Sequence, residues 1–413
     1  MNEKLPLCLT AVICFSLLSS ACTDETAECR NLYDAKKYSE ALPFCEKACK
    51  NDDVNGCENA GVIYENNKED LQAITYYQKA CTLNGIKGCR NLGDIYKNSQ
   101  DDQELAKTYY ETACFLNDGK GCYDLVEILL KERYNNIDEA QSMFDEIFRI
   151  SEKSCNLGYG KGCTQIGQIF EKGAGAGSVV FKRRDISKAA EYYDKACNLN
   201  DGWGCYMYGY KEVQYTRNFY KMKKYFEKSC DLNYMHACAK LGELYFYNSF
   251  YKDGGIGEEK DSQKAGVYYK KACELGRDYH YCRKLGELYK DGFFSKFGIG
   301  EKEAAQKVEE YYKKACELED QYSCNELGKM FKDGFFSKFG IGEKEAAQKV
   351  EEYYKKACEL KHDISCRDLG RMYRDGFFSQ IGIGEKEAAQ KTQEYYEKTC
   401  DLDALYCRTF NQN

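Results

Sequence analysis

Apolar residues recur three to four positions apart along most of this chain, which is the spacing of one face of an amphipathic helix. Around Cys282 the stripe continues at Leu285 and Leu288, and a second stripe runs through Val308 and Ala315. Only two prolines occur in 413 residues, so few positions oppose helix formation. The pattern therefore predicts a protein that is helical almost throughout.

The predicted helices come in pairs. The first helix of a pair, here named helix A, begins near a cysteine and has the motif C-x-x-L-G-x-L/M-Y/F. The second, here named helix B, ends with K-A-C in most copies. About seven residues separate the cysteine of helix B from the cysteine of the next helix A. Successive copies are 32 to 43 residues apart, and residues 290–318 are identical to residues 332–360. Periods of this length are typical of solenoids, in which each hairpin packs on its neighbours. The sequence therefore predicts an all-α solenoid.

Glycine occupies the middle of helix A at one register, as at Gly286, Gly328 and Gly370. A glycine inside a helix costs about 1 kcal/mol relative to alanine. Its recurrence predicts that helix B approaches closely at this register, and we expect the alanines of helix B to make the contact. The aromatic residues of helix B, such as Tyr311 and Tyr312, are expected to pack between neighbouring hairpins.

The chain contains 25 cysteines, and most fall in regularly spaced pairs. Such a density favours disulfides and an oxidising compartment over a cytosolic thiol protein. Zinc is the weaker alternative, because zinc sites need clustered C-x-x-C or Cys/His groups, and His236, His280 and His362 bear no regular relation to the pairs. No C-x-x-C motif occurs, so redox catalysis is not supported. We expect no metal site and no cofactor.

The charge balance argues against one class of partner. Charged residues make up 31% of the chain and the net charge is -7, whereas a nucleic-acid-binding surface needs a basic surplus. The local basic run at 182–184 is expected to be solvated. A protein or peptide partner is expected instead.

Residues 1–21 have the features of a signal peptide. An apolar run from Leu5 to Leu18 is too short for an ordinary membrane span, and small residues follow it. Cleavage after Ala21 leaves Cys22 first, which makes Cys22 a candidate lipidation site, as in bacterial lipoproteins. Of the 23 cysteines from residue 22 onward, Cys22 is the one without a pair. Lipid anchoring and simple secretion, into the periplasm or out of the cell, stay open as alternatives.

The mature chain divides into three parts. Residues 22–49 form a predicted capping hairpin, in which Cys29 and Cys45 lie on antiparallel helices and are expected to form a disulfide. Residues 50–407 form the repeat array, and residues 408–413 form a polar tail.

The elements A-x-x-x-L-G-x-x-Y, G-x-G and Y-Y-x-K-A-C resemble Sel-1-like repeats, which are related to tetratricopeptide repeats. With a cysteine pair in every unit, residues 24–407 resemble the Helicobacter cysteine-rich protein family. The resemblance implies a right-handed superhelix of αα-hairpins, export from the cell, and one disulfide across each short spacing. The implied disulfides are Cys49–Cys57, Cys81–Cys89, Cys114–Cys122, Cys155–Cys163, Cys197–Cys205, Cys230–Cys238, Cys273–Cys282, Cys316–Cys324, Cys358–Cys366 and Cys400–Cys407.

Members of that family are also described as penicillin-binding proteins or slow β-lactamases. The resemblance therefore implies, as an alternative function, that the chain binds or hydrolyses β-lactams or binds peptidoglycan fragments. Serine β-lactamases use S-x-x-K together with S-D-N and K-T-G. This chain has one S-x-x-K match, from Ser249 to Lys252, and lacks both companion motifs. The catalytic residues are unknown, and the activity rests on the resemblance alone.

A solenoid of this kind presents a surface lined mainly by helix A to peptides or protein partners. In the last, nearly identical copies, helix B is kept while polar positions of helix A differ. Drift on a solvated face would explain the same variation. The candidate binding surface consists of Arg283, Asn325 and Arg367 in one register and Glu287, Lys329 and Arg371 in another. We expect an exported scaffold that binds proteins or peptides at the cell envelope or outside the cell.

The connection from helix A to helix B carries paired phenylalanines in the last three copies, beginning at Phe293, Phe335 and Phe377. An exposed row of such residues would mark an interface. The favoured interpretation is that they fold under the connection and cover the helix ends.

Overall fold

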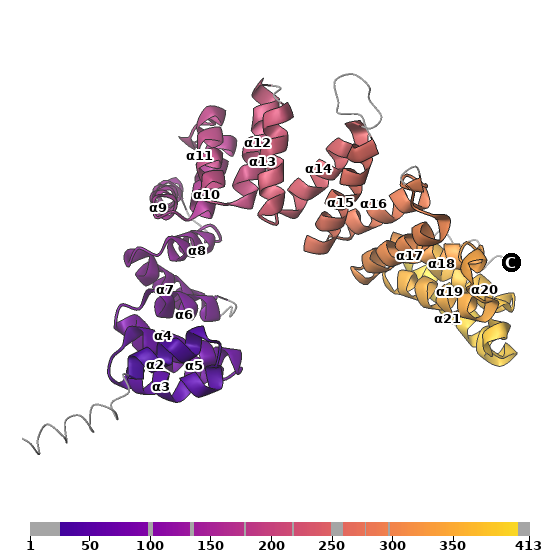
Figure 1. The fold of residues 1–413 in the computed structure, drawn as a ribbon, viewed down its shortest axis with the longest axis horizontal. Coiled ribbons are helices and arrows are strands. Elements are labelled where there is room, and N and C mark those ends of the chain that lie inside the picture. The colour runs from indigo at the N-terminus through magenta and orange to yellow at the C-terminus, as the bar shows by residue number, and fades with distance from the viewer. Residues whose placement is uncertain are drawn as a thin grey trace, which may run out of the picture. The chain divides into compact units, whose positions relative to one another are not determined.

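Successive helices follow one another through the computed structural model, which describes residues 25–97, 102–132, 136–176, 179–216, 219–248, 259–276, 278–295 and 298–403 (Figure 1). The predicted signal peptide, Cys22 and the C-terminal tail lie outside these residues. The chain divides into two compact units, Met1–Met207 and Tyr208–Asn413. No helix in the described ranges is long and apolar enough to cross a membrane.

In the first unit each helix packs mainly on its neighbours in the chain, and α2, α3, α4 and α8 also reach the next helix but one. This is the packing of a solenoid, in which a repeat contacts only adjacent repeats. The helices are α2 (Glu25–Asp34), α3 (Tyr38–Lys50), α4 (Val54–Asn66), α5 (Asp70–Thr82), α6 (Ile86–Tyr96), α7 (Gln103–Phe115), α8 (Gly119–Leu129), α9 (Ile137–Asn156), α10 (Gly160–Lys172), α11 (Ile186–Asn198) and the first part of α12 (Gly202–Thr216).

The second unit repeats the same arrangement and confirms the predicted all-α solenoid. Its A helices are the even-numbered ones, and its B helices the odd-numbered ones. After the end of α12 they are α13 (Phe219–Asp231), α14 (Met235–Asn248), α15 (Glu259–Leu275), α16 (Tyr279–Lys290), α17 (Glu301–Glu317), α18 (Gln321–Lys332), α19 (Glu343–Glu359), α20 (Asp363–Arg374) and α21 (Glu385–Leu402), with short 3-10 helices η2 (Ser337–Phe339) and η3 (Phe377–Ile381) in the connections.

A small β-hairpin replaces the usual connection between α10 and α11. Strand β1 (Ala174–Ala176) pairs antiparallel with β2 (Val179–Lys182), and both strands contact α9. The sequence pattern did not predict it, because strands of three and four residues are too short to show an alternating period.

Disulfides close the corner between each B helix and the following A helix. In the first copy, Cys49 and Cys57 are joined across a separation of eight residues with their Cα atoms 4.5 Å apart. The described residues contain the bonds Cys29–Cys45, Cys49–Cys57, Cys81–Cys89, Cys114–Cys122, Cys155–Cys163, Cys197–Cys205, Cys230–Cys238, Cys273–Cys282, Cys316–Cys324 and Cys358–Cys366. Cys400 is also disulfide-bonded, and its predicted partner Cys407 lies outside the described residues.

The helix-A glycines do mark a close approach of helix B, but the contact residue is different from the one expected. A Cβ on Gly328 would lie 2.6 Å from the ring of Tyr354, and a Cβ on Gly93 would lie 2.6 Å from the ring of Tyr110. The expectation that alanines make this contact was therefore wrong. The glycine leaves room for an aromatic ring four residues before the helix-B cysteine, and that ring is buried.

In one repeat the larger residue of this contact lies on helix A and the smaller residue lies on helix B. In α8 the glycine position is occupied by Val126, and in α9 the tyrosine position is occupied by Ser151; both side chains are fully buried. A larger residue on helix A is thus matched by a smaller one on helix B. Because interiors are close-packed, such paired changes keep the volume between two helices nearly constant.

The second phenylalanine of each pair in the connections is packed inside, as favoured from the sequence, and the first is half-buried against the core. Phe294, Phe336 and Phe378 are at most 5% exposed. Each lies against the aromatic residue near the end of its own A helix, with Phe336 and Phe331 ring centroids 4.4 Å apart. These residues therefore extend the core and do not form an exposed row.

Candidate functional site

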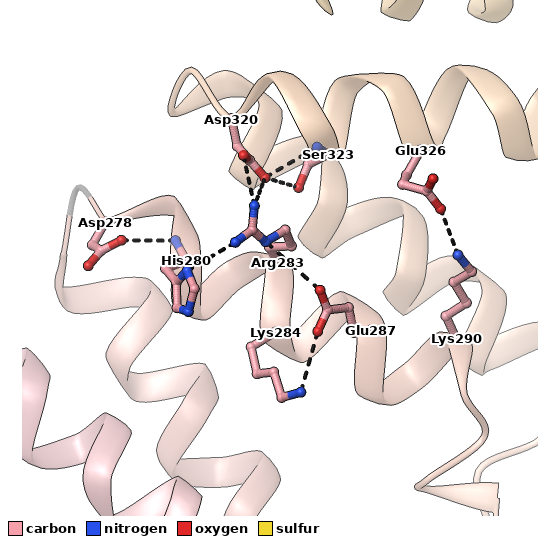
Figure 2. Close-up of polar contacts among 9 residues, drawn as sticks. All are labelled: Asp278, His280, Arg283, Lys284, Glu287, Lys290, Asp320, Ser323 and Glu326. Atoms are coloured by element: carbon pink, nitrogen blue, oxygen red, sulfur yellow. Dashed lines mark hydrogen bonds and ion pairs between the residues drawn. The ribbon is translucent and has the colours of Figure 1, made fainter. Parts of the chain in front are cut away.

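The first candidate register lies at the seam between consecutive A helices. Arg283, which follows Cys282 directly, donates from Nη1 to Oδ1 of Asp320 at 3.1 Å (Figure 2). Asp320 is only 2% exposed and caps α18, where its carboxylate accepts from the backbone N–H of Ser323 at 3.2 Å and from its hydroxyl at 2.5 Å. The guanidinium of one repeat therefore holds the helix cap of the next repeat.

The same register makes the same kind of contact elsewhere. Arg90 pairs with Asp118, the cap of α8, at 2.8 Å, and the Thr164 hydroxyl donates to Asp201 at 2.5 Å. Asn325 accepts from the Ser365 hydroxyl at 2.9 Å. We name this position, one residue after the helix-A cysteine, the seam register.

Glu58 shows why the seam register matters for folding. Helix α6 begins after Gly85, which has no side chain to cap it. The carboxylate of Glu58, from the preceding repeat, accepts from the backbone N–H groups of Lys87 at 2.9 Å and Gly88 at 3.2 Å. A neighbouring repeat thus supplies the acceptor that the first turn of a helix requires.

The second candidate register, five residues after the helix-A cysteine, lies at the surface. Lys329 is exposed, and the Glu287 and Arg371 side chains retain 39% and 48% of their exposure. Glu287 forms an ion pair with Lys284 of its own helix at 3.4 Å (Figure 2), and Arg371 with Asp368 at 3.5 Å. We name this position the face register. Exposed ion pairs of this kind contribute little to stability.

The structure therefore separates the six candidate residues. Arg283 and Asn325 are engaged in the seam, and Arg367 lies half-buried at the same register beside Asp368, at 3.8 Å. Glu287, Lys329 and Arg371 face solvent. A cross-repeat ion pair between Lys290 and Glu326, at 2.7 Å, borders the same face (Figure 2).

In the first unit a pocket opens on the A-helix face between α10 and α12. Its volume is about 520 Å³. Gln168, five residues after Cys163, brings the face register into it. The sequence reasoning missed this pocket, although Trp203, the single tryptophan of the chain, is an available signal. The lining residues are Gln168, Glu171, Lys172, Arg184, Trp203 and Met207.

The tyrosines around these helices act as neutral hydrogen-bond donors. Burial, followed by a hydrogen bond to Glu46, raises the pKa of Tyr76 to about 12. Burial and the hydrogen bond that Tyr193 donates to Glu171 at 2.7 Å likewise raise the pKa of Tyr193. Since a raised pKa keeps a phenol protonated at neutral pH, these groups position helices and are poor bases.

The sequence also raised two possible kinds of chemical site, a metal site and a serine β-lactamase motif. Within the described ranges, no group of three or more His, Cys, Asp and Glu side chains is placed to hold a metal ion. The S-x-x-K match, from Ser249 to Lys252, lies outside those ranges.

Comparison of the sequence with known protein families identifies a repeat family. The Sel1 repeat family matches residues 67–85, 86–118, 155–201, 203–234, 236–276, 280–320, 321–362 and 364–403. The chain belongs to the Sel1 repeat family. The predicted relationship is confirmed. The matches leave out α2, α3 and α4 before residue 67, and they leave out most of the hairpin α8–α9 in residues 119–154, where Val126 and Ser151 replace the usual glycine and tyrosine. A search of curated protein sequences finds no match.

Solved structures similar to this chain include a Sel1 repeat protein, a protective antigen and a cysteine-rich protein. A Sel1 repeat protein from Oxalobacter formigenes is 18% identical with a TM-score of 0.50, over 60% of this chain and 99% of that one. The protective antigen c5321 of uropathogenic Escherichia coli, described as displaying an SLR fold, is 17% identical over 90% of this chain and 80% of that chain, with a TM-score of 0.46. Helicobacter pylori cysteine rich protein B is 34% identical over 34% of this chain and 96% of that chain, with a TM-score of 0.26.

Proposed function

We propose that this Sel1 repeat protein is an exported, disulfide-stapled scaffold that binds protein or peptide partners along the exposed face of its A helices. One observation supports the proposal. Helix A has two variable polar registers, one of which contacts the next repeat while the other lies at the surface. The seam register is engaged within the chain, whereas the face register points to solvent. Glu287 and Arg371 form only exposed ion pairs, Glu287 with Lys284 and with Arg283 at 3.9 Å, and Arg371 with Asp368. Exposed pairs contribute little to stability, so these variable charges are available for recognition.

The disulfides support a location outside the cytoplasm. Bonds at every described corner form and persist only where thiols are oxidised. We place the protein at the cell envelope or outside the cell, after removal of residues 1–21, with Cys22 as the candidate lipid anchor. Mass spectrometry of the native N-terminus tests this: an unprocessed Met1 overturns the export proposal, while an unmodified Cys22 supports secretion without a lipid.

The binding proposal is tested on an array of immobilised peptides with the purified, oxidised protein. The test variant reverses the face register through Glu287→Lys, Lys329→Glu and Arg371→Glu. The matched control makes the same change in net charge on exposed positions of B helices, through Glu317→Lys, Lys313→Glu and Lys355→Glu. We expect the first variant to change the set of bound peptides and the control to keep it. Equal effects of the two variants, or no saturable binding, would contradict the proposal.

The alternative function, binding or hydrolysis of β-lactams or binding of peptidoglycan fragments, has its basis in the family resemblance. Nitrocefin turnover and covalent labelling with a fluorescent penicillin test it on the same oxidised protein. Turnover or a stable label at a single residue would favour the alternative and would identify the nucleophile by peptide mapping.

A further inference from the structure

The pocket on the first unit differs from the rest of the A-helix face in shape and in charge. Its volume of about 520 Å³ lies inside the range of about 300–1,000 Å³ that is typical of ligand sites. Helix α10 supplies Gln168, Glu171 and Lys172, while Trp203 and Met207 come from α12. Arg184 closes the side next to the β-hairpin. The connection that contains the β-hairpin therefore brings a cation to this pocket.

The side chains of the two cations in the pocket have no partner among the described residues. Lys172 and Arg184 are both exposed, and neither side chain forms a hydrogen bond or an ion pair there. Glu171 is the one carboxylate in the lining, and it already accepts the hydroxyl of Tyr193 at 2.7 Å. The lining therefore carries a net charge of about +1 on a chain whose net charge is -7. A negatively charged ligand complements it.

The floor of the pocket is apolar. Trp203 is half-buried, and its ring lies 6.4 Å from the ring of Tyr193, measured between centroids. Met207, one helical turn further along α12, adds an adaptable thioether surface. Because the indole packs against the buried ring of Tyr193, part of its freedom is already lost, and its exposed part can contact a ligand at a smaller entropic cost.

We infer that this pocket binds an acidic peptide segment in which a carboxylate side chain is adjacent to an apolar one. The carboxylate lies between Lys172 and Arg184, and the apolar side chain packs on Trp203 and Met207. The amide of Gln168 pairs with the peptide backbone. The inference rests on the proposed function and assigns a ligand chemistry to one place on the A-helix face.

The single tryptophan makes the test specific, because all indole emission comes from this pocket. The probes are two blocked pentapeptides, Gly-Leu-Glu-Glu-Gly and its isostere Gly-Leu-Gln-Gln-Gly, titrated into the full oxidised chain. We expect the acidic peptide to change the Trp203 emission and to bind at least 10-fold more tightly than the amide peptide. We also expect its affinity to fall as salt is raised, since ion pairs at an exposed site are screened.

Two neighbouring arginines provide the control. Arg184→Ala is expected to weaken binding of the acidic peptide at least fivefold, while Arg183→Ala, which removes an exposed arginine outside the lining, leaves it unchanged. Equal affinity for the two peptides, equal effects of the two substitutions, or no emission change at millimolar peptide would overturn the inference. Peptide binding on the array with no response from Trp203 would overturn the pocket assignment and leave the proposed scaffold function standing.

Discussion

Substitution of Gly328 by alanine tests whether the glycine of helix A exists to admit a tyrosine from helix B. An added Cβ would lie 2.6 Å from Cδ2 and 2.9 Å from Cε2 of Tyr354. Tyr354 is 2% exposed and packs in the core of its repeat, so the ring has little room to retreat. The equivalent glycine one repeat earlier, Gly286, is looser, because its Cβ would meet the ring of Tyr312 at 3.3 Å.

These two distances predict opposite results from the same substitution. In an unconstrained helix interior, Gly→Ala stabilises by about 1 kcal/mol. At Gly328 the overlap must be relieved by moving a buried ring, and overpacking costs about 1–3 kcal/mol. We therefore expect Gly328→Ala to destabilise its hairpin by about 1 kcal/mol. At Gly286 a shift of a few tenths of an ångström suffices, so Gly286→Ala is expected to be neutral or slightly stabilising.

Hydrogen exchange read on peptides from α18 and α19, and from α16 and α17, is the appropriate assay, since a solenoid need not unfold in one step. The expected result is faster opening of α18 and α19 in the Gly328 variant, with unchanged or slower exchange of α16 and α17 in the Gly286 variant. The reasoning fails if Gly328→Ala protects α18, or if both variants lose protection equally.

Three further predictions concern stability. Replacing Cys316 and Cys324 by alanine removes a loop closure of nine residues and should cost about 2.5 kcal/mol in the chain-entropy model, measured as the shift in urea unfolding of the oxidised protein; no shift would refute it. Lys361 has φ +68° at a loop position where four other repeats have asparagine and one has glycine with positive φ, while Asp52 and Glu319 occupy it elsewhere. Lys361→Gly should therefore stabilise by about 0.5–1 kcal/mol, and a loss in thermal unfolding would contradict this. His362 caps α20 through Nδ1, which accepts from the N–H of Ser365 at 3.2 Å, and burial lowers its pKa. Because the unfolded chain then binds the proton more readily, the N-terminal end of α20 should lose stability as pH falls below about 6.5. His362→Asp introduces the residue type that caps α18, and it should remove this loss when hydrogen exchange is compared between pH 7 and pH 5.

The periodic features of the chain were predictable because the same physical requirement recurs in every copy. A cysteine at a helix end and an apolar stripe at helical spacing report local geometry, which neighbouring residues determine. The partner of the mid-helix glycine was not predictable in the same way. Both an alanine and a tyrosine lie near it along helix B, and only the rotation of one helix about its axis brings Tyr354 over Gly328.

The candidate site was predicted in part for a related reason. Variation between near-identical copies identifies positions that the helix itself does not constrain, and both Arg283 and Glu287 satisfy that criterion. It does not reveal that Arg283 reaches a buried carboxylate 37 residues later. The pocket beside Trp203 depends on the β-hairpin that positions Arg184, and strands of three and four residues leave no period in the sequence.

The residues of the seam register also differ according to the helix start that they face. Arg90 and Arg283 each face an aspartate cap, whereas Glu58 faces bare amides at a helix that lacks a side-chain cap. Exchanging these residues would place a carboxylate against a buried carboxylate, or a guanidinium against N–H donors. The charge of each of these seam residues is therefore matched to the cap of the repeat that follows it.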